Sequence, residues 1–263
     1  MHTETGIHVV ARGAGDKTPV VLVHGAWHGA WCWEGNYLDQ FAAAGHPVKA
    51  LDLRGNGESR ARGAMRWNRI SGYADDIAEV VALCPRPPVV VGHSMGGFAL
   101  QHAMARGVKM AGACLLASAP QHGVWRTSLH ILRTRPITFA KINLLLSLWP
   151  VVSDAEAAHA LLVEPDAAPE VKARLTENLG DEAYLAFLDM LALNLPRKPD
   201  APPPVLIVGG EEDAIFSVKE QQSLQRRFDA PMHILPQTPH NIMMSRASDR
   251  SGQIILDWMA EIA

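Results

Sequence analysis

The chain has 263 residues, of which 48% are hydrophobic and 19% charged, and its formal net charge is −3. This length supports a large buried core without disulfides or a structural metal, and it fits one domain with an insertion. Lysine and arginine are scattered and form no basic stripe, so nothing supports a nucleic-acid partner. No apolar run approaches the roughly eighteen residues of a membrane-spanning helix, and residues 1–15 lack the pattern of a signal peptide, so we expect no membrane anchor.

The three cysteines, Cys32, Cys84 and Cys114, are odd in number and show no Cys-x-x-Cys spacing. This usage is typical of small core residues in a reducing compartment. We therefore expect a cytoplasmic protein. The sequence leaves the oligomeric state open, with a homodimer as one option.

Short apolar strands and segments of helical spacing alternate through the first part of the chain. In chain order, we expect strands at 7–11 and 20–23, a helix at 33–45, a strand at 48–53, a helix at 73–83, a strand at 87–91, a helix at 98–106 and a strand at 111–117. This alternation predicts an α/β fold with a mostly parallel central sheet and helices on both faces.

The alternation stops between residues 120 and 204, where the pattern is helical and no β-branched strand is evident. Helices are expected at 142–149, 154–163, 170–179 and 181–195. We interpret residues 120–204 as a helical lid inserted between two parts of the core, residues 1–119 and 205–263. The lid contains apolar residues at helical spacing, which is typical of a core, although some of them must face the cleft: Leu144, Leu145, Leu148, Trp149, Leu161, Leu162, Leu185 and Leu188.

Three consecutive prolines at 202–204 mark a stiff return to the sheet. The second part of the core is then expected to contain strands at 205–208 and 233–235. An amphipathic helix at 252–262 closes the chain.

The sequence Gly-His-Ser-Met-Gly at 92–96 follows the β-branched strand at 87–91 and opens a helical segment. This is the setting of a nucleophile elbow, in which a sharp strand-to-helix turn projects the hydroxyl of Ser94. Glycines flank the serine because side chains there would collide with the neighbouring strand and helix. Ser94 is therefore the candidate nucleophile.

A second loop, which begins at His24 after the strand at 20–23, can direct another backbone amide toward the serine. The amides of Ala26 and Met95 are the candidate oxyanion hole, since both belong to turns that follow buried strands. Trp27 is either a pocket wall or a packing residue. Trp31 and Trp33 are interpreted as packing residues between sheet and lid.

An acid and a histidine follow the last two expected strands. Asp213 lies in the loop after the strand at 205–208, where Glu211 and Glu212 compete with it for the role of orienting carboxylate. Among the twelve histidines, His240 lies in a stiff loop after the strand at 233–235, while the competing His233 lies within that strand.

The chain order of the candidates is serine, acid, histidine, which is the order of the α/β-hydrolases. His24 and His28 lie four residues apart, a spacing that suits a metal on a helix. They flank a glycine-containing turn, however, and no acidic ligand is close in sequence, so a metal site is disfavoured. No cofactor is expected.

The chain resembles the α/β-hydrolase superfamily over nearly its whole length outside the lid. The segments 24–33 and 92–97 are similar to the branch that contains plant-type methyl esterases and hydroxynitrile lyases, and Asp52–Ser59 resembles the glycine-rich loop of those proteins. Residues 210–216 and 239–244 are more similar to bacterial carboxylesterases described as lysophospholipases. Hydroxynitrile lyases of this branch typically carry Thr where this chain has Gly25, and Lys where it has Asn241.

The resemblance implies a serine hydrolase that cleaves carboxylic esters of small to medium apolar substrates through a Ser-His-Asp triad and an acyl-enzyme. The residues at Gly25 and Asn241 favour an esterase over a lyase. Two alternatives stay open at this point. One is non-hydrolytic chemistry on the same fold, as in hydroxynitrile lyases or cofactor-free dioxygenases, and the other is a small-molecule receptor with residual esterase activity.

Overall fold

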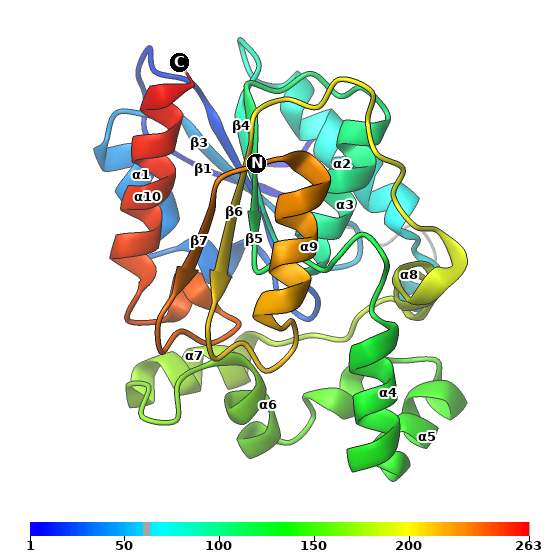
Figure 1. Ribbon diagram of the computed structural model, residues 1–263. Coiled ribbons are helices and arrows are strands. Elements are labelled where there is room, and N and C mark those ends of the chain that lie inside the picture. The colour runs from blue at the N-terminus through cyan, green and yellow to red at the C-terminus, as the bar shows by residue number, and fades with distance from the viewer. Residues whose placement is uncertain (60–63, 263) are drawn as a thin grey trace.

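The computed structural model describes residues 1–59 and 64–262, and within them the central sheet has seven strands (Figure 1). The strands lie in the order β1-β3-β2-β4-β5-β6-β7. The edge strand β1 is antiparallel to β3, and every other neighbouring pair is parallel. The strands are β1 (Val9–Arg12), β2 (Val20–Val23), β3 (Val48–Leu51), β4 (Val89–His93), β5 (Gly112–Leu116), β6 (Val205–Gly210) and β7 (Met232–Leu235).

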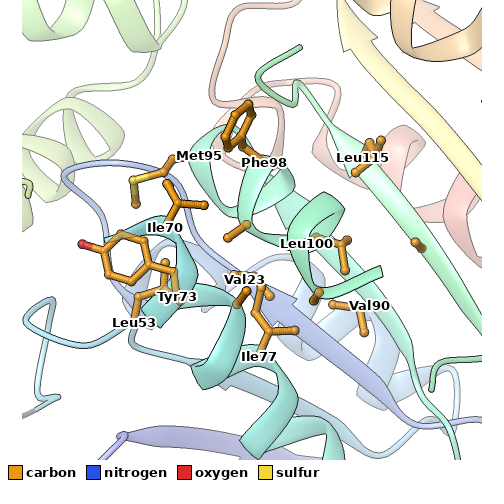
Figure 2. Packing of buried hydrophobic residues seen from close by; sticks show 14 of the residues in the cluster. Val23, Leu53, Ile70, Tyr73, Ile77, Val90, Met95, Phe98, Leu100 and Leu115 are labelled. Atoms are coloured by element: carbon orange, nitrogen blue, oxygen red, sulfur yellow. The ribbon is translucent and has the colours of Figure 1, made fainter. Parts of the chain in front are cut away.

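Helices cover both faces of the sheet, because successive strand residues point to opposite sides and nearly all of them are apolar. Val21 and Val23 pack on the face covered by α2, α3 and α9, whereas Val20 and Leu22 pack on the face covered by α1 and α10 (Figure 1). Figure 2 shows the first of these layers, where residues of α2 and α3 meet the sheet. The predicted fold class is thereby confirmed.

The helices, with the bounds that the structure gives them, are α1 (Tyr37–Ala43), α2 (Ile70–Ala82), α3 (Met95–Ala105), α4 (Trp125–Thr134), α5 (Pro136–Leu145), α6 (Ala155–Leu162), α7 (Pro169–Asn178), α8 (Tyr184–Leu188), α9 (Val218–Phe228) and α10 (Ser248–Glu261). Short helical turns occur at η1 (Ala30–Trp33), η2 (Met65–Trp67), η3 (Trp149–Val151), η4 (Asp189–Leu193) and η5 (Ile242–Met244).

The helices α4 to α8 form an insertion between β5 and β6, and α4 to α7 lie beyond the carboxyl ends of the central strands (Figure 1). The insertion has an apolar cluster of its own, which includes Leu148, Leu162 and Leu175 and is packed against Trp27 and Trp31 of the core. We propose that residues 120–204 act as a lid over that end of the sheet. Residue 263, the last of the predicted second core segment, lies outside the described residues.

The helix boundaries inside the insertion differ from the predicted ones. The helix expected at 142–149 is instead α5, which ends where Leu146 adopts a left-handed conformation with φ of 51°. The helix α4 was not expected at all. The helix expected at 181–195 is the short α8, which continues as the π-helical turn η4. The helix expected at 33–45 begins as η1 and resumes as α1.

Three of the apolar insertion residues expected in a core are on the surface instead. Leu144 and Leu145 are exposed, as is Trp149, while Leu148 and Leu162 are buried. Periodicity places residues on a common helix face, but it does not say whether anything covers that face. The outward face of α5 is uncovered here.

Cys32 and Cys114 are buried, Cys84 is half-buried, and all three are free thiols. Across residues 1–59 and 64–262, no helix combines the length and apolar character needed to span a bilayer.

Candidate active site

The serine elbow is built by β4, which ends at His93, and α3, which begins at Met95. Between them Ser94 adopts φ of 55° and ψ of −119°, a conformation that is strained for a residue with a side chain. The surroundings leave no room for larger neighbours, since a Cβ on Gly96 would lie 2.3 Å from the carbonyl oxygen of His24. A Cβ on Gly92 would lie 2.8 Å from the carbonyl oxygen of Gly96. The tight turn therefore requires the glycines of the motif.

The sheet register brings the remaining candidate loops to the same edge. Val23 of β2 pairs with Gly92 of β4, so the loop after β2 emerges beside the elbow. On the other side, Gly210 of β6 pairs with Leu235 of β7, which places the loops that carry Asp213 and His240 together. Ligand sites of parallel sheets form at these carboxyl ends.

The side chains of Ser94, His240 and Asp213 form a continuous hydrogen-bonded chain. The Nε2 atom of His240 lies 2.9 Å from the Ser94 Oγ, and its Nδ1 lies 2.8 Å from the Asp213 Oδ2. The other carboxylate oxygen of Asp213 accepts the amide hydrogens of Ile215 at 2.8 Å and Phe216 at 2.9 Å. Both the imidazole and the carboxylate are buried.

The hydrogen-bond partners assign the tautomer of His240. A carboxylate can only accept, so the Nδ1–H of His240 donates to Asp213. The lone pair of Nε2 is then directed at the hydroxyl of Ser94, which can donate its proton to it. This is the arrangement in which an imidazole can act as a general base toward the serine.

The alternative acids and the alternative histidine lie elsewhere. Glu211 and Glu212 are exposed, and Glu211 accepts the amide hydrogen of Gln237 at 3.3 Å. His233 is on β7, as its position in an apolar run indicated, and its side chain is exposed to solvent.

Ala26 and Met95 line the same cavity as Ser94. Met95 is in the first turn of α3, where a helix supplies no carbonyl partner for the amide. Within the described residues, the Ala26 amide likewise donates no hydrogen bond. The loop that carries Ala26 touches the elbow closely, since a Cβ on Gly25 would lie 2.8 Å from the Cβ of Ser94.

The Ala26 loop is held by several contacts that the sequence did not reveal. The Nδ1–H of His28 donates to the carbonyl of Ala26 at 2.6 Å, and the Nε2 of His28 accepts a hydrogen bond from Asn241 at 3.0 Å. Burial lowers the pKa of His28 to about 3, so this ring is neutral near pH 7. Trp27, whose φ is 65°, accepts the amide hydrogen of Gly180 at 2.9 Å.

Glu182 of the insertion is buried beneath this loop and reaches the core. Its Oε1 accepts the hydroxyl hydrogen of Tyr73 at 2.5 Å and the amide hydrogen of Ala183 at 2.7 Å. Burial raises the pKa of Glu182 to about 7, against the hydrogen bonds from Tyr73 and from the amides of Ala183 and Trp27, which lower it. No local pattern marks Glu182 in the sequence, because its partners come from distant segments.

The two histidines considered as metal ligands, His24 and His28, use their ring nitrogens in hydrogen bonds within the protein. The Nδ1–H of His24 donates to the carbonyl of Gly25 at 2.8 Å, and its Nε2 accepts the amide hydrogen of Leu53 at 3.0 Å. Both ring nitrogens of His28 are occupied as well. Within residues 1–59 and 64–262, no group of three or more His, Cys, Asp or Glu side chains is arranged to hold a metal ion.

A cavity of about 70 Å³ lies at Ser94, between the elbow and the insertion. The hydroxyls of Thr127 and Ser128 line it, but they donate to the carbonyls of Ile215 and Val124, both at 3.0 Å. None of the described lining residues is charged. The cavity is bordered by Ala26, Trp27, Ser94, Met95, Val124, Thr127, Ser128, Ile131, Phe139, Ile142, Leu148, Val151, Phe187, Met190, Ile215 and Phe216.

The structure also distinguishes the three tryptophans near the site. Trp27 borders the cavity, and its indole N–H donates to the carbonyl of Leu148 at 3.3 Å. Trp33 was expected between the sheet and the lid, but it is fully buried on the face of the sheet that α1 and α10 cover. Trp31 packs against the insertion and stacks on His28 with the ring centroids 5.3 Å apart. Neither of these two lines the cavity.

The sequence model of the alpha/beta hydrolase family matches residues 20–251. The chain belongs to this family. The match spans the sheet from β2 onward, the insertion and all the candidate site residues, and it confirms the resemblance seen in the sequence. Among solved structures, a thermophilic esterase from Thermogutta terrifontis superposes with a TM-score of 0.72 at 22% identity over 97% of this chain and 93% of the other, which shows the shared fold.

Curated relatives of this alpha/beta hydrolase include Methylesterase 3 of Arabidopsis thaliana, which is 40% identical over 90 residues, or 34% of each chain. Norfluorocurarine synthase 2 of a Strychnos species is also 40% identical, over 86 residues and 32% of each chain. The chain thus spans about a third of the length of the curated relatives it matches.

Proposed function

We propose that this alpha/beta hydrolase is a serine esterase that cleaves carboxylic esters of small to medium apolar substrates. The observation that carries the proposal is the chain of hydrogen bonds from Asp213 through His240 to Ser94, with Ser94 at the border of an apolar cavity. Esterases among the similar proteins, such as Methylesterase 3 and the Thermogutta enzyme, support the same reaction type.

In the proposed mechanism, His240 takes the proton of Ser94 while the Oγ attacks the ester carbonyl. The tetrahedral oxyanion accepts hydrogen bonds from the amides of Ala26 and Met95. His240 then protonates the leaving alcohol, and an acyl-enzyme remains on Ser94. In the second half His240 activates water, which releases the acid. Asp213 holds the imidazole in the required tautomer and stabilises its charged form.

The cavity chemistry favours an apolar group next to the scissile ester. The lining hydroxyls of Thr127 and Ser128 already have carbonyl partners, so the walls offer few polar groups to a ligand. Burial of apolar surface contributes about 25 cal/mol per Å² to binding, and a covered cavity also excludes bulk water from the intermediate. Trp27 is proposed as a wall of this pocket.

The non-hydrolytic alternatives receive less support from the site. The side chain of Asn241, which stands where hydroxynitrile lyases typically carry Lys, donates to His28 and does not border the cavity. The tight space around Gly25 also leaves no room for the Thr of those lyases without a shift of the elbow. An ester substrate needs neither residue.

The test is hydrolysis of p-nitrophenyl esters of graded acyl length by the purified protein, together with labelling by a fluorophosphonate probe. We expect turnover of the shorter esters, labelling of Ser94, and a loss on the order of 10⁴ to 10⁶ in kcat/KM for Ser94→Ala. Labelling without turnover of any ester would contradict the esterase and favour a lyase or a receptor. Absence of labelling would contradict the assignment of Ser94 as nucleophile.

A further inference from the structure

The helices α4 and α5 contain positive charge without negative charge. Residues 120–153 include no Asp or Glu, although the whole chain has 27 acidic residues and a formal net charge of −3. The same segment carries Arg126, Arg133, Arg135 and Lys141. Within the described residues none of these four forms an ion pair. Their charges are therefore available to an anionic partner.

Large apolar side chains are exposed on the same two helices. Leu144 is 83% exposed and Ile137 is 73% exposed. In the described part of the chain, 11 large hydrophobic residues are exposed. More than half of them lie within residues 120–153: Trp125, Leu132, Ile137, Leu144, Leu145 and Trp149. A concentration of this kind marks a binding surface, whereas single exposed apolar residues are ordinary.

The apolar and basic residues share the outward faces. On α5, Ile137, Lys141 and Leu144 are spaced four and three residues apart, which places them on one side of the helix. On α4, Trp125 and Leu132 are two turns apart. The opposite faces of the two helices line the cavity. Each helix thus has one apolar side turned to the cavity and another turned to solvent.

The two helices are at the periphery of the molecule. Figure 1 shows α4 and α5 side by side at the lower right, at the end of the insertion away from the sheet. Nothing in the described chain covers Ile137 or Leu144. We call the outer face of α4 and α5 the hairpin face. It consists of Trp125, Arg126, Leu132, Arg133, Ile137, Lys141 and Leu144.

We propose that the hairpin face docks on the surface of an anionic lipid bilayer. Leucine, isoleucine and tryptophan side chains enter the boundary between headgroups and acyl chains, while long Arg and Lys side chains reach the phosphates. Each basic residue near such a surface strengthens binding by about fivefold. A symmetric dimer through this face is disfavoured, because it would place the same unpaired cations of two copies against each other.

The docking would place the entrance of the cavity near the bilayer. A second hollow, bordered by His130, Thr134 and Arg135, adjoins the cavity and shares Trp27 and Ile131 with it. If the proposed esterase function holds, on which this step rests, an apolar ester dissolved in the membrane could pass between these residues to Ser94. Docking itself requires no catalysis.

The test is cosedimentation of the full chain with vesicles of phosphatidylcholine, with and without phosphatidylglycerol. We expect binding to the anionic vesicles that weakens at high salt, and little binding to neutral ones. The double variant Ile137→Ser, Leu144→Ser should lower the partition coefficient by at least about tenfold. Arg126→Gln with Arg133→Gln should lower it by about 25-fold. The matched control Leu83→Ser, an exposed leucine at the end of α2, should bind like the unaltered protein.

Failure to bind anionic vesicles, or equal loss in Leu83→Ser, would overturn the proposal. Light scattering of the protein alone provides a second readout: a dimer that Ile137→Ser, Leu144→Ser dissociates would assign the hairpin face to self-association instead. Circular dichroism and turnover of a short soluble ester should be unchanged in all of these variants, because none of the replaced residues borders the cavity. Vesicle binding without ester turnover would contradict only the proposed esterase function.

Discussion

At the scale of single residues, the geometry of the site depends on hydrogen bonds that hold the buried side chains of Asp213 and His240. The carboxylate of Asp213 accepts hydrogen bonds from two backbone amides and from the Nδ1–H of His240. The two amides hold the carboxylate in the position from which it orients the imidazole. His93 adds a further restraint, since its Nε2–H donates to the carbonyl of His240 at 3.0 Å. Burial lowers the pKa of His93 well below its usual range, so this ring stays neutral.

Replacement of Asp213 by Asn should reduce kcat/KM by a factor on the order of 10⁴, because the amide can donate to Nδ1 and so stabilise the wrong tautomer. The measurement is steady-state hydrolysis of a p-nitrophenyl ester. Glu212→Gln is the matched control, since Glu212 is one residue away and exposed. An equal loss in both variants would assign the effect to the loop and not to the carboxylate.

Glu182 should make stability depend on pH in a recognisable direction. Burial raises its folded pKa from the ordinary value of 4.5 to about 7, so the folded state binds more protons than the unfolded state between those values. The contribution of protonated Glu182 to the free energy of unfolding is therefore fully present below about pH 4.5 and is lost as the pH rises through the folded pKa of about 7. Compared with Glu182→Gln, the unaltered protein should lose about 3 kcal/mol of its free energy of unfolding over this range.

The measurement is urea unfolding of the unaltered protein and of Glu182→Gln across this pH range. The difference between the two isolates the contribution of the Glu182 carboxyl, because all other titrating groups are common to both proteins. Parallel pH profiles of the two proteins would show that the carboxyl of Glu182 does not titrate in this range.

At the scale of elements, helix ends illustrate which signals are local and which are tertiary. The helix α9 begins with a capping box, in which the Ser217 side chain accepts the Glu220 amide hydrogen and the Glu220 side chain accepts that of Ser217. That signal is present in the sequence and predicts a helix start. The start of α2 has no such residue, and Asp189 from η4 accepts the amide hydrogen of Ile70 at 3.1 Å instead.

Ser217→Ala should lower the free energy of unfolding by about 1 kcal/mol, because it removes one half of the capping box. Chemical denaturation provides the measurement. Ser153→Ala is a suitable control, since Ser153 is exposed and its side chain makes no hydrogen bond within the described residues. A cost no larger than that of the control would mean that α9 is held by packing alone.

At the scale of the whole molecule, the insertion is joined to the core by buried polar contacts as well as by apolar packing. Asp189 of η4 is fully buried and binds the guanidinium of Arg69, with the Arg69 Nε at 2.8 Å. Glu182 makes the neighbouring link to Tyr73. These contacts fix where the insertion lies over the carboxyl ends of the strands, and so they determine the shape of the cavity.

Arg69→Met should destabilise the protein by about 3 kcal/mol, because it leaves the carboxylate of Asp189 buried without its charged partner. Arg106→Met provides the matched control: Arg106 pairs with Asp75 at 2.6 Å, but both side chains are exposed, so the loss should stay below about 1 kcal/mol. Thermal or urea unfolding of the two variants gives the comparison. Equal losses would show that the Arg69 link contributes no more than a surface pair.

The sequence by itself determined the sheet and the loops that carry the site. The runs of β2, β4 and β6 are apolar on both faces and therefore indicate buried strands, and the Gly-x-Ser-x-Gly turn is a local requirement of the backbone. Parallel strands with aligned carboxyl ends then bring Ser94, Asp213 and His240 to one edge. These features are predictable because each depends on short-range sterics or on strong burial.

Only the tertiary structure decided how the insertion lies and what supports the Ala26 loop. Helical spacing did not distinguish the covered Leu148 from the exposed Leu144, since both lie on apolar faces and only packing against the core separates them. Glu182 and its partner Tyr73 are 109 residues apart, and no local preference links them. Contacts of this kind depend on the assembled fold, which is why the sequence could indicate the chemistry but not the walls around it.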